Sequence, residues 1–212
     1  MIRTKADLIF YLEKDREALK RPARKRFAGS FKDIVKRILD PDLIWRFERV
    51  LRYTEYYSNN FGGINRFLYW WWNYKFKRLS LKLGFSIPLN VFGPGLSIAH
   101  YGTIVVNQKA RVGNNCRLHA CVNIGVRKGK APQIGDNCYI GPGVIMYGDI
   151  TIANDITIGA NSVVNHSFEK EKVVIAGSPA RIIRENVMPW VEWFLPTLGE
   201  KQEMSHNEKD SL

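Results

Sequence analysis

The sequence has few of the features that mark secreted, disulfide-bonded or membrane-spanning proteins. Only three cysteines occur in 212 residues, which is too few for a disulfide framework, and no spacing of cysteine or histidine suggests a metal site. The longest apolar cluster, Phe67 to Trp72, is far shorter than the roughly 18 residues that a spanning helix needs. The N-terminus lacks the basic, apolar and small-residue order of a secretion signal. These absences predict a cytoplasmic protein without a metal cofactor.

Acidic residues are scarce in the N-terminal third. Residues 1 to 83 contain 20 Lys+Arg against 9 Asp+Glu, a net charge of +11, whereas the remainder contributes only +1 of the total of +12. Such localised basicity indicates an acidic partner for the N-terminal region, namely phosphates, an anionic glycan or a negatively charged membrane surface. No nucleic-acid recognition motif accompanies the charge, so a nucleic-acid partner is not expected.

The chain contains a six-residue repeat between Val106 and Val164. Small aliphatic residues return at every sixth position: Val106, Val112, Leu118 and Ile124, then Ile134, Ile140, Met146, Ile152, Ile158 and Val164. A period of six fits neither a helix nor a simple strand, but it indicates a parallel β-helix in which three hexapeptides make one triangular coil. Glycines that follow several of these aliphatic residues are expected to let the backbone turn each corner.

Helical patterns precede the repeat. Helices are expected over about residues 5 to 20, 31 to 39, from Asp40-Pro41 to about 58, and 64 to 83. The chain therefore divides into three parts. These are a basic helical region (1–84), a β-helix (85–184), and a C-terminal segment (185–212) in which Trp190 and Trp193 anchor a short stretch before a disordered tail.

The last of these helices interleaves aromatic residues with cations. Trp70, Trp71 and Trp72 stand among basic residues such as Lys75 and Arg78. We expect the aromatic residues to pack this helix onto the first coil or onto a neighbouring subunit. The alternative is an interfacial helix that contacts a membrane surface peripherally.

Two features break the repeat. Counting back in sixes from Val106 reaches His100 where an aliphatic residue is expected, and such breaks tend to mark functional sites. Ile124 and Ile134 are ten residues apart, so four extra residues push 126–133 out as a basic loop that could close over an anionic ligand. Cys116 and Cys138 occupy equivalent places in the repeat and are expected to stack as reduced packing residues.

These residues resemble the serine O-acetyltransferase branch of the hexapeptide-repeat acyltransferases, which also includes capsule and exopolysaccharide acetyltransferases. The segments that carry the resemblance are 93–100, 122–125, the ladder 134–164 and the closing 176–181. The resemblance implies a left-handed β-helix, a homotrimer, and acetyl-CoA lying between adjacent subunits. It also implies His100 as the catalytic base, contacts to the cofactor from the backbone at Val126, Pro142 and Ala160, and Arg181 near its nucleotide end.

The remaining site residues are assigned on chemical grounds. A neutral imidazole can take a proton from an attacking hydroxyl at cytoplasmic pH, and a backbone N–H near Gly125 could stabilise the oxyanion. Lys128 and Lys130 are candidate cofactor contacts. The candidate acceptor contacts are Tyr101, Asn107, His119 and Asn123. Of these, Asn107 is also a candidate to orient the imidazole. The alternatives are that His119 is a surface residue without a role in the site and that Asn123 caps a turn.

Departures from the serine acetyltransferase pattern bear on the acceptor and on the base. Two groups that hold the charged ends of serine in that pattern are missing at Ala99 and Ala131, and the Asp that orients the histidine ring is replaced by Phe85. A zwitterion left unpaired in a buried site loses affinity. The sequence therefore favours a saccharide hydroxyl, as in capsule or exopolysaccharide biosynthesis, over the alternative of serine in cysteine biosynthesis. A third reading, a non-catalytic or metal-dependent prism, lacks three histidines at converging positions.

Overall fold

The computed structural model describes residues 1–21 and 42–195. Its helices are α1 (Lys5–Ala18), α3 (Leu43–Asn59), α4 (Asn65–Leu83) and α5 (Trp190–Phe194). The expected start of α1 is confirmed by a capping box in which Thr4 and Asp7 bond each other's backbone N–H. Asp42 rather than Asp40 caps α3, because the Asp42 side chain accepts from the N–H of Trp45. The helix expected over 31–39 and the tail after 199 lie outside the described residues.

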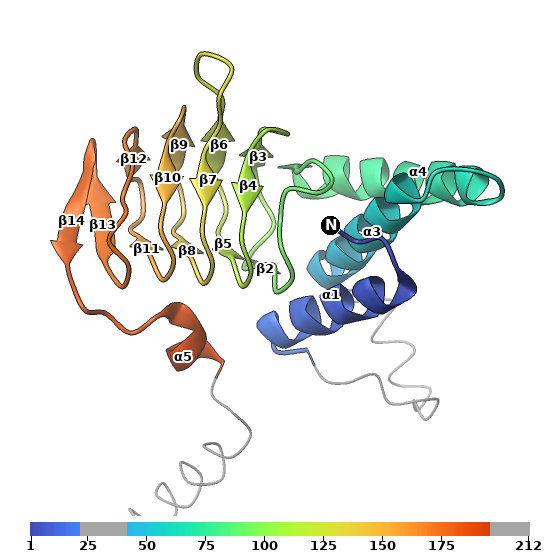
Figure 1. The fold of residues 1–212 in the computed structure, drawn as a ribbon, viewed down its shortest axis with the longest axis horizontal. Helices are drawn as coiled ribbons and strands as arrows, with labels where there is room; N and C mark the ends of the chain where they lie inside the picture. Colours follow the sequence, from blue (N-terminus) through green and yellow to red (C-terminus); the bar gives the residue numbers. More distant parts are fainter. Residues whose placement is uncertain (22–41, 196–212) are drawn as a thin grey trace, which may run out of the picture.

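Residues 85 to 184 form a parallel β-solenoid, which confirms the expected β-helix of hexapeptide repeats after an α-helical region (Figure 1). Its strands form three walls. Wall A contains β1 (Phe85–Ser86), β3 (Ile104–Val106), β6 (Asn123–Gly125), β9 (Ile145–Tyr147) and β12 (Val163–Val164). Wall B contains β4 (Arg111–Val112), β7 (Gln133–Ile134) and β10 (Thr151–Ile152). Wall C contains β2 (Ser97–Ile98), β5 (Arg117–Leu118), β8 (Tyr139–Ile140), β11 (Thr157–Ile158), β13 (Val174–Gly177) and the antiparallel β14 (Ala180–Arg184).

The repeat positions point into a continuous core. Ile98 pairs with Leu118, Leu118 with Ile140 and Ile140 with Ile158, and all four are buried. The register also confirms the stacking of Cys116 on Cys138, because their neighbours Arg117 and Tyr139 are partners, and both cysteines are free and buried.

The corners of the coils turn through asparagines and an aspartate rather than through the glycines after the ladder residues. Asn115, Asn137 and Asp155 have φ values of 52°, 56° and 57°, and their side chains are joined by hydrogen bonds of 2.9 Å. Gly113 serves another purpose, because an added Cβ would lie 2.8 Å from the carbonyl carbon of Gly135 on the next coil. The close stacking of the coils therefore explains this glycine.

Buried charged side chains of the helices cap the open end of the solenoid. Arg52 on α3 is fully buried and donates to Asp15 on α1, to Glu55, and to the carbonyls of Phe92 and Gly93. The carboxylates in turn accept backbone N–H groups of the first coil: Asp15 accepts from Gly95 and Leu96, Glu48 from Ile98, and Glu55 from Asn90. The open edge is thus satisfied by side chains instead of by a further strand.

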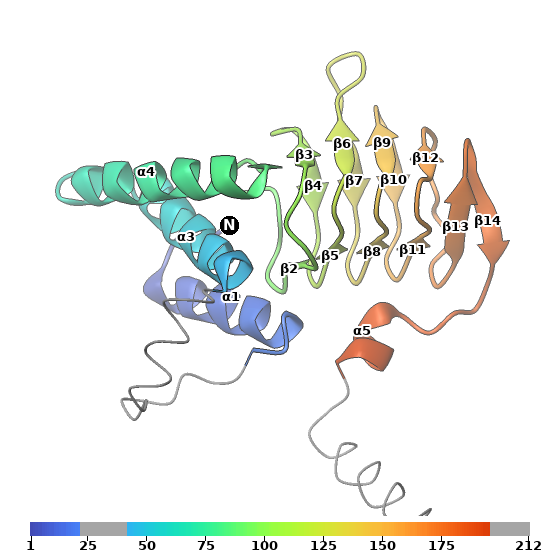
Figure 2. The ribbon, with the colours of Figure 1, turned by 180° about the vertical axis from the view of Figure 1, so that it is seen from behind.

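The helices extend from this capped end, and α5 lies beside the solenoid (Figures 1 and 2). Trp190 on α5 is completely buried and donates its ring N–H to the carbonyl of Asn115 at 2.9 Å. It therefore anchors the C-terminal segment as expected, whereas Trp193 is largely exposed. In the described ranges, no helix combines the length and the apolar character needed to cross a membrane.

Candidate functional site

His100 lies on the corner where the chain passes from wall C to wall A. The register corrects the expectation that it replaces a ladder residue, because Ile98 is the inward partner of Leu118. The ladder then continues at Ile104 and Val106. Two extra residues in this first coil shift the count of six and put His100 on the surface. The residue is exposed, so its ring is open to an approaching molecule.

His119 stands on the next coil beside His100. The two ring centroids are 5.9 Å apart, and the ring of Tyr139 lies 4.9 Å on the other side of His119. The Nε2 atom of His119 is buried without a hydrogen-bond partner among the described residues. Burial, then the positive charges of Arg117 and His100, lower the pKa of His119 to about 4. His119 is therefore neutral at physiological pH and a much weaker base than an ordinary histidine.

The predicted basic loop does leave the solenoid, between β6 and β7 (Figure 1). Arg127 and Lys130 bond each other's backbone, and Lys128 and Gly129 between them both have positive φ, as a two-residue hairpin turn requires. Lys109 donates to the carbonyl of Gly129, and Lys130 forms an ion pair with Asp149. These contacts fix the orientation of the loop relative to the solenoid, and the Lys128 side chain is exposed.

The predicted site residues fall into two groups on opposite edges of wall A. The edge between walls C and A carries His100, Tyr101, Pro142 and Ala160, with His119 next to it. The edge between walls A and B carries Asn107, Gly125, Val126, Lys128 and Lys130. The strands of wall A separate the two edges, so one chain does not bring His100 to its own loop.

The remaining predicted residues lie away from the imidazole. Asn107 cannot orient the ring of His100 in the same chain, because the two residues flank β3 at its opposite ends, and its Oδ1 accepts from the N–H of Lys109. Asn123 faces outward in the middle of wall A, between Val105 and Ile145 on neighbouring strands. Arg181 lies on β14 at the far end of wall C. Within one chain, Asn107 therefore does not orient the imidazole.

Two hollows formed by the described residues lie away from His100. One cavity of about 350 Å³ lies between the N-terminal helices and the first coils, lined by Tyr11, Glu55 and Asn90 among others. Another of about 460 Å³ lies between α1 and α5. Neither is lined by His100. In the part of the chain that the structure describes, no group of three or more His, Cys, Asp or Glu side chains could hold a metal ion.

Two residues that act on His119 were not identified from the sequence. Tyr139 packs against its imidazole, and the positive charge of Arg117 lowers its pKa. The guanidinium of Arg117 in turn lies 4.0 Å from the ring centroid of Phe194 on α5. The 22-residue offset between Cys116 and Cys138 already aligns Arg117 with Tyr139, so this spacing could have found the tyrosine. The repeat could not predict the contact with α5, because this helix lies outside the repeat.

Comparison with known proteins agrees with this architecture. Residues 131–166, which lie within the solenoid, match the family described as "Bacterial transferase hexapeptide (six repeats)". The chain is 36% identical over 98 residues to a serine acetyltransferase of Staphylococcus xylosus, a match that covers 44% of this chain and 45% of the relative. It is 34% identical over 98 residues to a serine acetyltransferase of Staphylococcus aureus strain Mu50, covering 44% and 46%. The chain thus spans less than half the length of these curated relatives.

The fold is also similar to a solved serine acetyltransferase from Brucella abortus strain S19. That structure has a TM-score of 0.62 and 26% identity, covering 82% of this chain and 68% of the other. These relatives overturn the saccharide acceptor favoured by the sequence, because each is named for serine.

Proposed function

We propose that this protein is an acetyl-CoA-dependent O-acetyltransferase and that it transfers the acetyl group to the hydroxyl of serine. The observation that carries the proposal is the exposed imidazole of His100 on a solenoid whose curated relatives are named serine acetyltransferases. His100 shares its edge of wall A with Pro142 and Ala160, two of the three positions assigned to the cofactor backbone contacts, while Val126 lies on the opposite edge. A row along one edge would suit an extended cofactor arm.

The complete site is assembled between two copies of the chain. His100 and the basic loop lie on opposite edges of wall A, so the loop that closes over the ligand must come from a neighbour. A homotrimer arranged around a threefold axis would bring the edge with His100 against the loop edge of the next copy three times. Exposed Val105 and Ile145 on wall A would then lie near the contact between copies.

The reaction requires one proton to move twice. A ring nitrogen of His100 takes the proton of the serine hydroxyl as its oxygen attacks the thioester carbonyl, which becomes a tetrahedral oxyanion. A backbone N–H at Gly125 or Val126 of the neighbour stabilises that oxyanion. The C–S bond then breaks, the imidazolium returns the proton to the thiolate, and O-acetylserine and CoA leave. No acyl-enzyme is formed, so Cys116 and Cys138 need no chemical role.

His119 supports the base without replacing it. Its pKa of about 4 keeps it neutral beside His100, so it adds no positive charge that would oppose the imidazolium formed during the reaction. Its ring lies 5.9 Å from that of His100 and packs on Tyr139. We assign it, with Tyr101 and Asn123, to the surface that receives the acceptor.

The charged ends of serine need partners other than those of the serine acetyltransferase pattern, since Ala99 and Ala131 are uncharged. Arg127 and Lys128 on the loop are exposed cations, and a guanidinium can bind a carboxylate through two parallel hydrogen bonds. The loop of the neighbouring copy would therefore hold the carboxylate of serine, while Lys130 and Arg181 would face the phosphates of CoA.

The decisive experiment measures the release of free CoA thiol from acetyl-CoA with serine, threonine, and a panel of mono- and oligosaccharides as acceptors. We expect turnover with serine, confirmed by mass spectrometry of O-acetylserine, and its loss in His100→Ala. The matched control is His166→Ala, because His166 is an exposed histidine that bonds only Asn165. Absence of serine turnover in a folded, trimeric preparation would refute the acceptor, and undiminished turnover by His100→Ala would refute the base.

A further inference from the structure

Helix α4 carries two apolar faces, of which the fold uses one. Its inner face packs on the body of the protein: the ring of Trp72 stacks on Tyr53 at 4.5 Å and Phe76 lies 5.7 Å from Phe47. Phe67, Trp70, Trp71 and Tyr74 follow one another at steps of three, one and three residues, which places them on a single outer face. Their exposed fractions are 66%, 59%, 57% and 60%.

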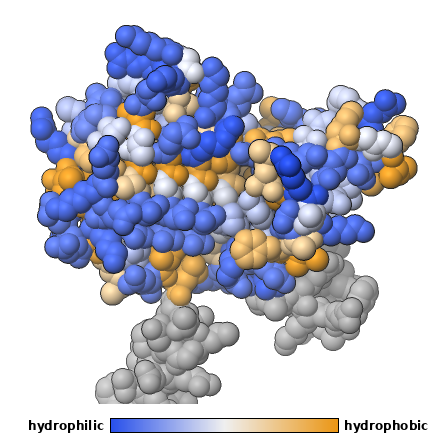
Figure 3. Space-filling model, viewed as in Figure 1, coloured by the Kyte–Doolittle hydropathy of each residue, from blue (hydrophilic) through white to orange (hydrophobic). Residues whose placement is uncertain are grey.

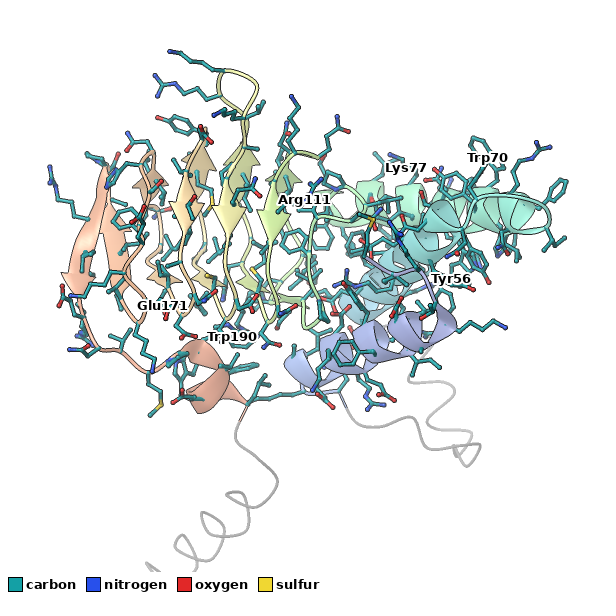
Figure 4. The ribbon with its side chains drawn as sticks, viewed as in Figure 1. Tyr56, Trp70, Lys77, Arg111, Glu171 and Trp190 are labelled. Carbon is teal, nitrogen blue, oxygen red and sulfur yellow. The ribbon has the colours of Figure 1, made fainter. Side chains whose placement is uncertain are left out.

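This outer aromatic face, defined as Phe67, Trp70, Trp71 and Tyr74, is remote from the solenoid. Figure 1 shows α4 projecting from the capped end of the molecule, and Figure 4 shows Trp70 on its outer side. Apolar residues gather at the free end of the helix in Figure 3, where Phe61 and Ile64 are also exposed. Phe76 of the inner face is part of the hydrophobic core, whereas for the outer face the expected packing on a neighbouring subunit stays a prediction. A contiguous apolar patch of this kind on a surface marks an interaction site.

The charged side chains of α4 are all basic. Helix α4 contains five cations and no acidic residue, and the chain has no aspartate or glutamate at all between Glu55 and Asp136. Lys75 lies 4.3 Å from the centroid of the Trp71 ring, and Arg78 lies 6.0 Å from that of Tyr74. Aromatic side chains occupy the first half of the outer side and Lys77, Arg78 and Lys82 occupy the second half.

We propose that the outer aromatic face of α4 docks on the surface of an anionic phospholipid bilayer, with the helix lying in the plane of the interface. Tryptophan and tyrosine suit the boundary between headgroups and acyl chains, because their rings are apolar at one end and polar at the other. The neighbouring cations meet the negative potential of anionic headgroups. The helix would lie on the membrane as amphipathic interfacial helices do.

A second copy of this chain is a poorer occupant. A twofold contact between two outer faces would bring the cations of both α4 helices together, and α4 has no carboxylate to compensate them. An anionic lipid surface supplies that charge without any specific geometry. The proposal is independent of the acetyltransferase reaction, because none of the residues assigned to that reaction lies on α4.

The test is sedimentation of the full chain with vesicles of phosphatidylcholine alone or mixed with phosphatidylglycerol. We expect binding to the anionic vesicles only, with a blue shift of tryptophan fluorescence, and a loss of binding as salt is raised. The double variant Trp70→Ala/Trp71→Ala should reduce the bound fraction at least about tenfold. The double variant Ile9→Ala/Phe10→Ala is the matched control, because these residues on α1 are exposed to a similar degree, 56% and 50%.

The charge contribution is tested separately with Lys75→Gln/Lys77→Gln/Arg78→Gln, which should weaken binding to anionic vesicles and flatten its salt dependence. The molar mass of each variant is measured by light scattering. Failure of the wild-type chain to bind anionic vesicles would overturn the proposal. Equal binding by the Trp70→Ala/Trp71→Ala variant would also overturn it, as would a drop in molar mass of that variant without a change in vesicle binding, which would identify a contact between copies.

Discussion

The rings of His100 and His119 lie 5.9 Å apart on neighbouring coils, and the first residue is exposed whereas the second is half-buried. The second has a buried, unpartnered Nε2 and a pKa lowered to about 4 by burial and by nearby positive charge. Proton transfer is most efficient when the pKa of the base lies near the working pH. The two imidazoles therefore differ in chemistry although they share one surface.

The first prediction concerns the base itself. His100→Ala should lower kcat/KM for serine by about 10²- to 10⁴-fold, the range that general-base catalysis supplies, because His119 is too weak a base to substitute. The measurement is thiol release under conditions where acetyl-CoA is saturating. His166→Ala should stay within a factor of about two of the wild type. Retention of activity by His100→Ala to within tenfold would exclude it from the base role.

The second prediction tests whether the site is shared between copies. Two separate variant chains are prepared: one carries His100→Ala, and the other carries alanine at Arg127, Lys128 and Lys130 of the loop. The two preparations are mixed in equal amounts, dissociated and reassembled. Each preparation alone should be nearly inactive. Random mixed trimers should recover about one quarter of the wild-type activity, because one site in four pairs an intact histidine with an intact neighbouring loop. A site contained within one chain would give no recovery on mixing.

The repeat in the sequence determines the solenoid because one physical rule operates at every coil. An aliphatic residue at each sixth position is buried against the equivalent residue of the next coil, as in the series Leu118, Ile140 and Ile158, so six-residue spacing alone predicts the walls and their core. The same rule placed His100 wrongly, since counting in sixes fails where two residues are inserted. The register, which begins at Ile98, depends on pairing that the sequence does not display.

Contacts between segments that are distant in the chain could not be predicted from the sequence. Arg52 bonds Asp15, which is 37 residues away, and the carbonyl of Gly93, which is 41 residues away. No local pattern distinguishes such an arginine from a solvated one. The outer aromatic face of α4 could not be located from the sequence, because alternation of aromatic residues and cations does not reveal which side of a helix the body of the protein covers.

The third prediction follows from the lowered pKa of His119. The unfolded chain binds a proton at this side chain near pH 6.5 and the folded chain only near pH 4, so the free energy of unfolding should fall as pH drops through that window. His119→Gln should flatten this dependence by about 1 kcal/mol, less than the full shift because the ring is only half-buried. Urea unfolding at several pH values measures it. His166→Gln serves as the control, and an unchanged slope in His119→Gln would contradict the prediction.

The fourth prediction concerns the buried arginine of the cap. Arg52→Met removes the partner of Asp15 and Glu55 and leaves the carbonyls of Phe92 and Gly93 unbonded. The free energy of unfolding should fall by about 3 to 5 kcal/mol. Lys170→Met breaks an exposed ion pair with Glu185 and should cost less than about 1 kcal/mol. Urea unfolding of the two variants compares these costs directly, and similar values would mean that Arg52 is not the centre of the cap.

The fifth prediction concerns Glu48, which is completely buried and bonds the N–H of Ile98 through Oε1 while Oε2 has no partner among the described residues. Burial, reinforced by the negative charge of Asp15, raises the pKa of Glu48 well above its usual value. The folded chain therefore retains a proton there that the unfolded chain loses, and stability should decline as pH rises above the ordinary carboxyl pKa.

Glu48→Gln keeps the acceptor and should abolish that decline with little loss at neutral pH. Glu48→Ala leaves the Ile98 N–H unbonded and should cost about 1 to 3 kcal/mol. Equal stability of the two variants in urea unfolding would show that this hydrogen bond does not hold the first coil.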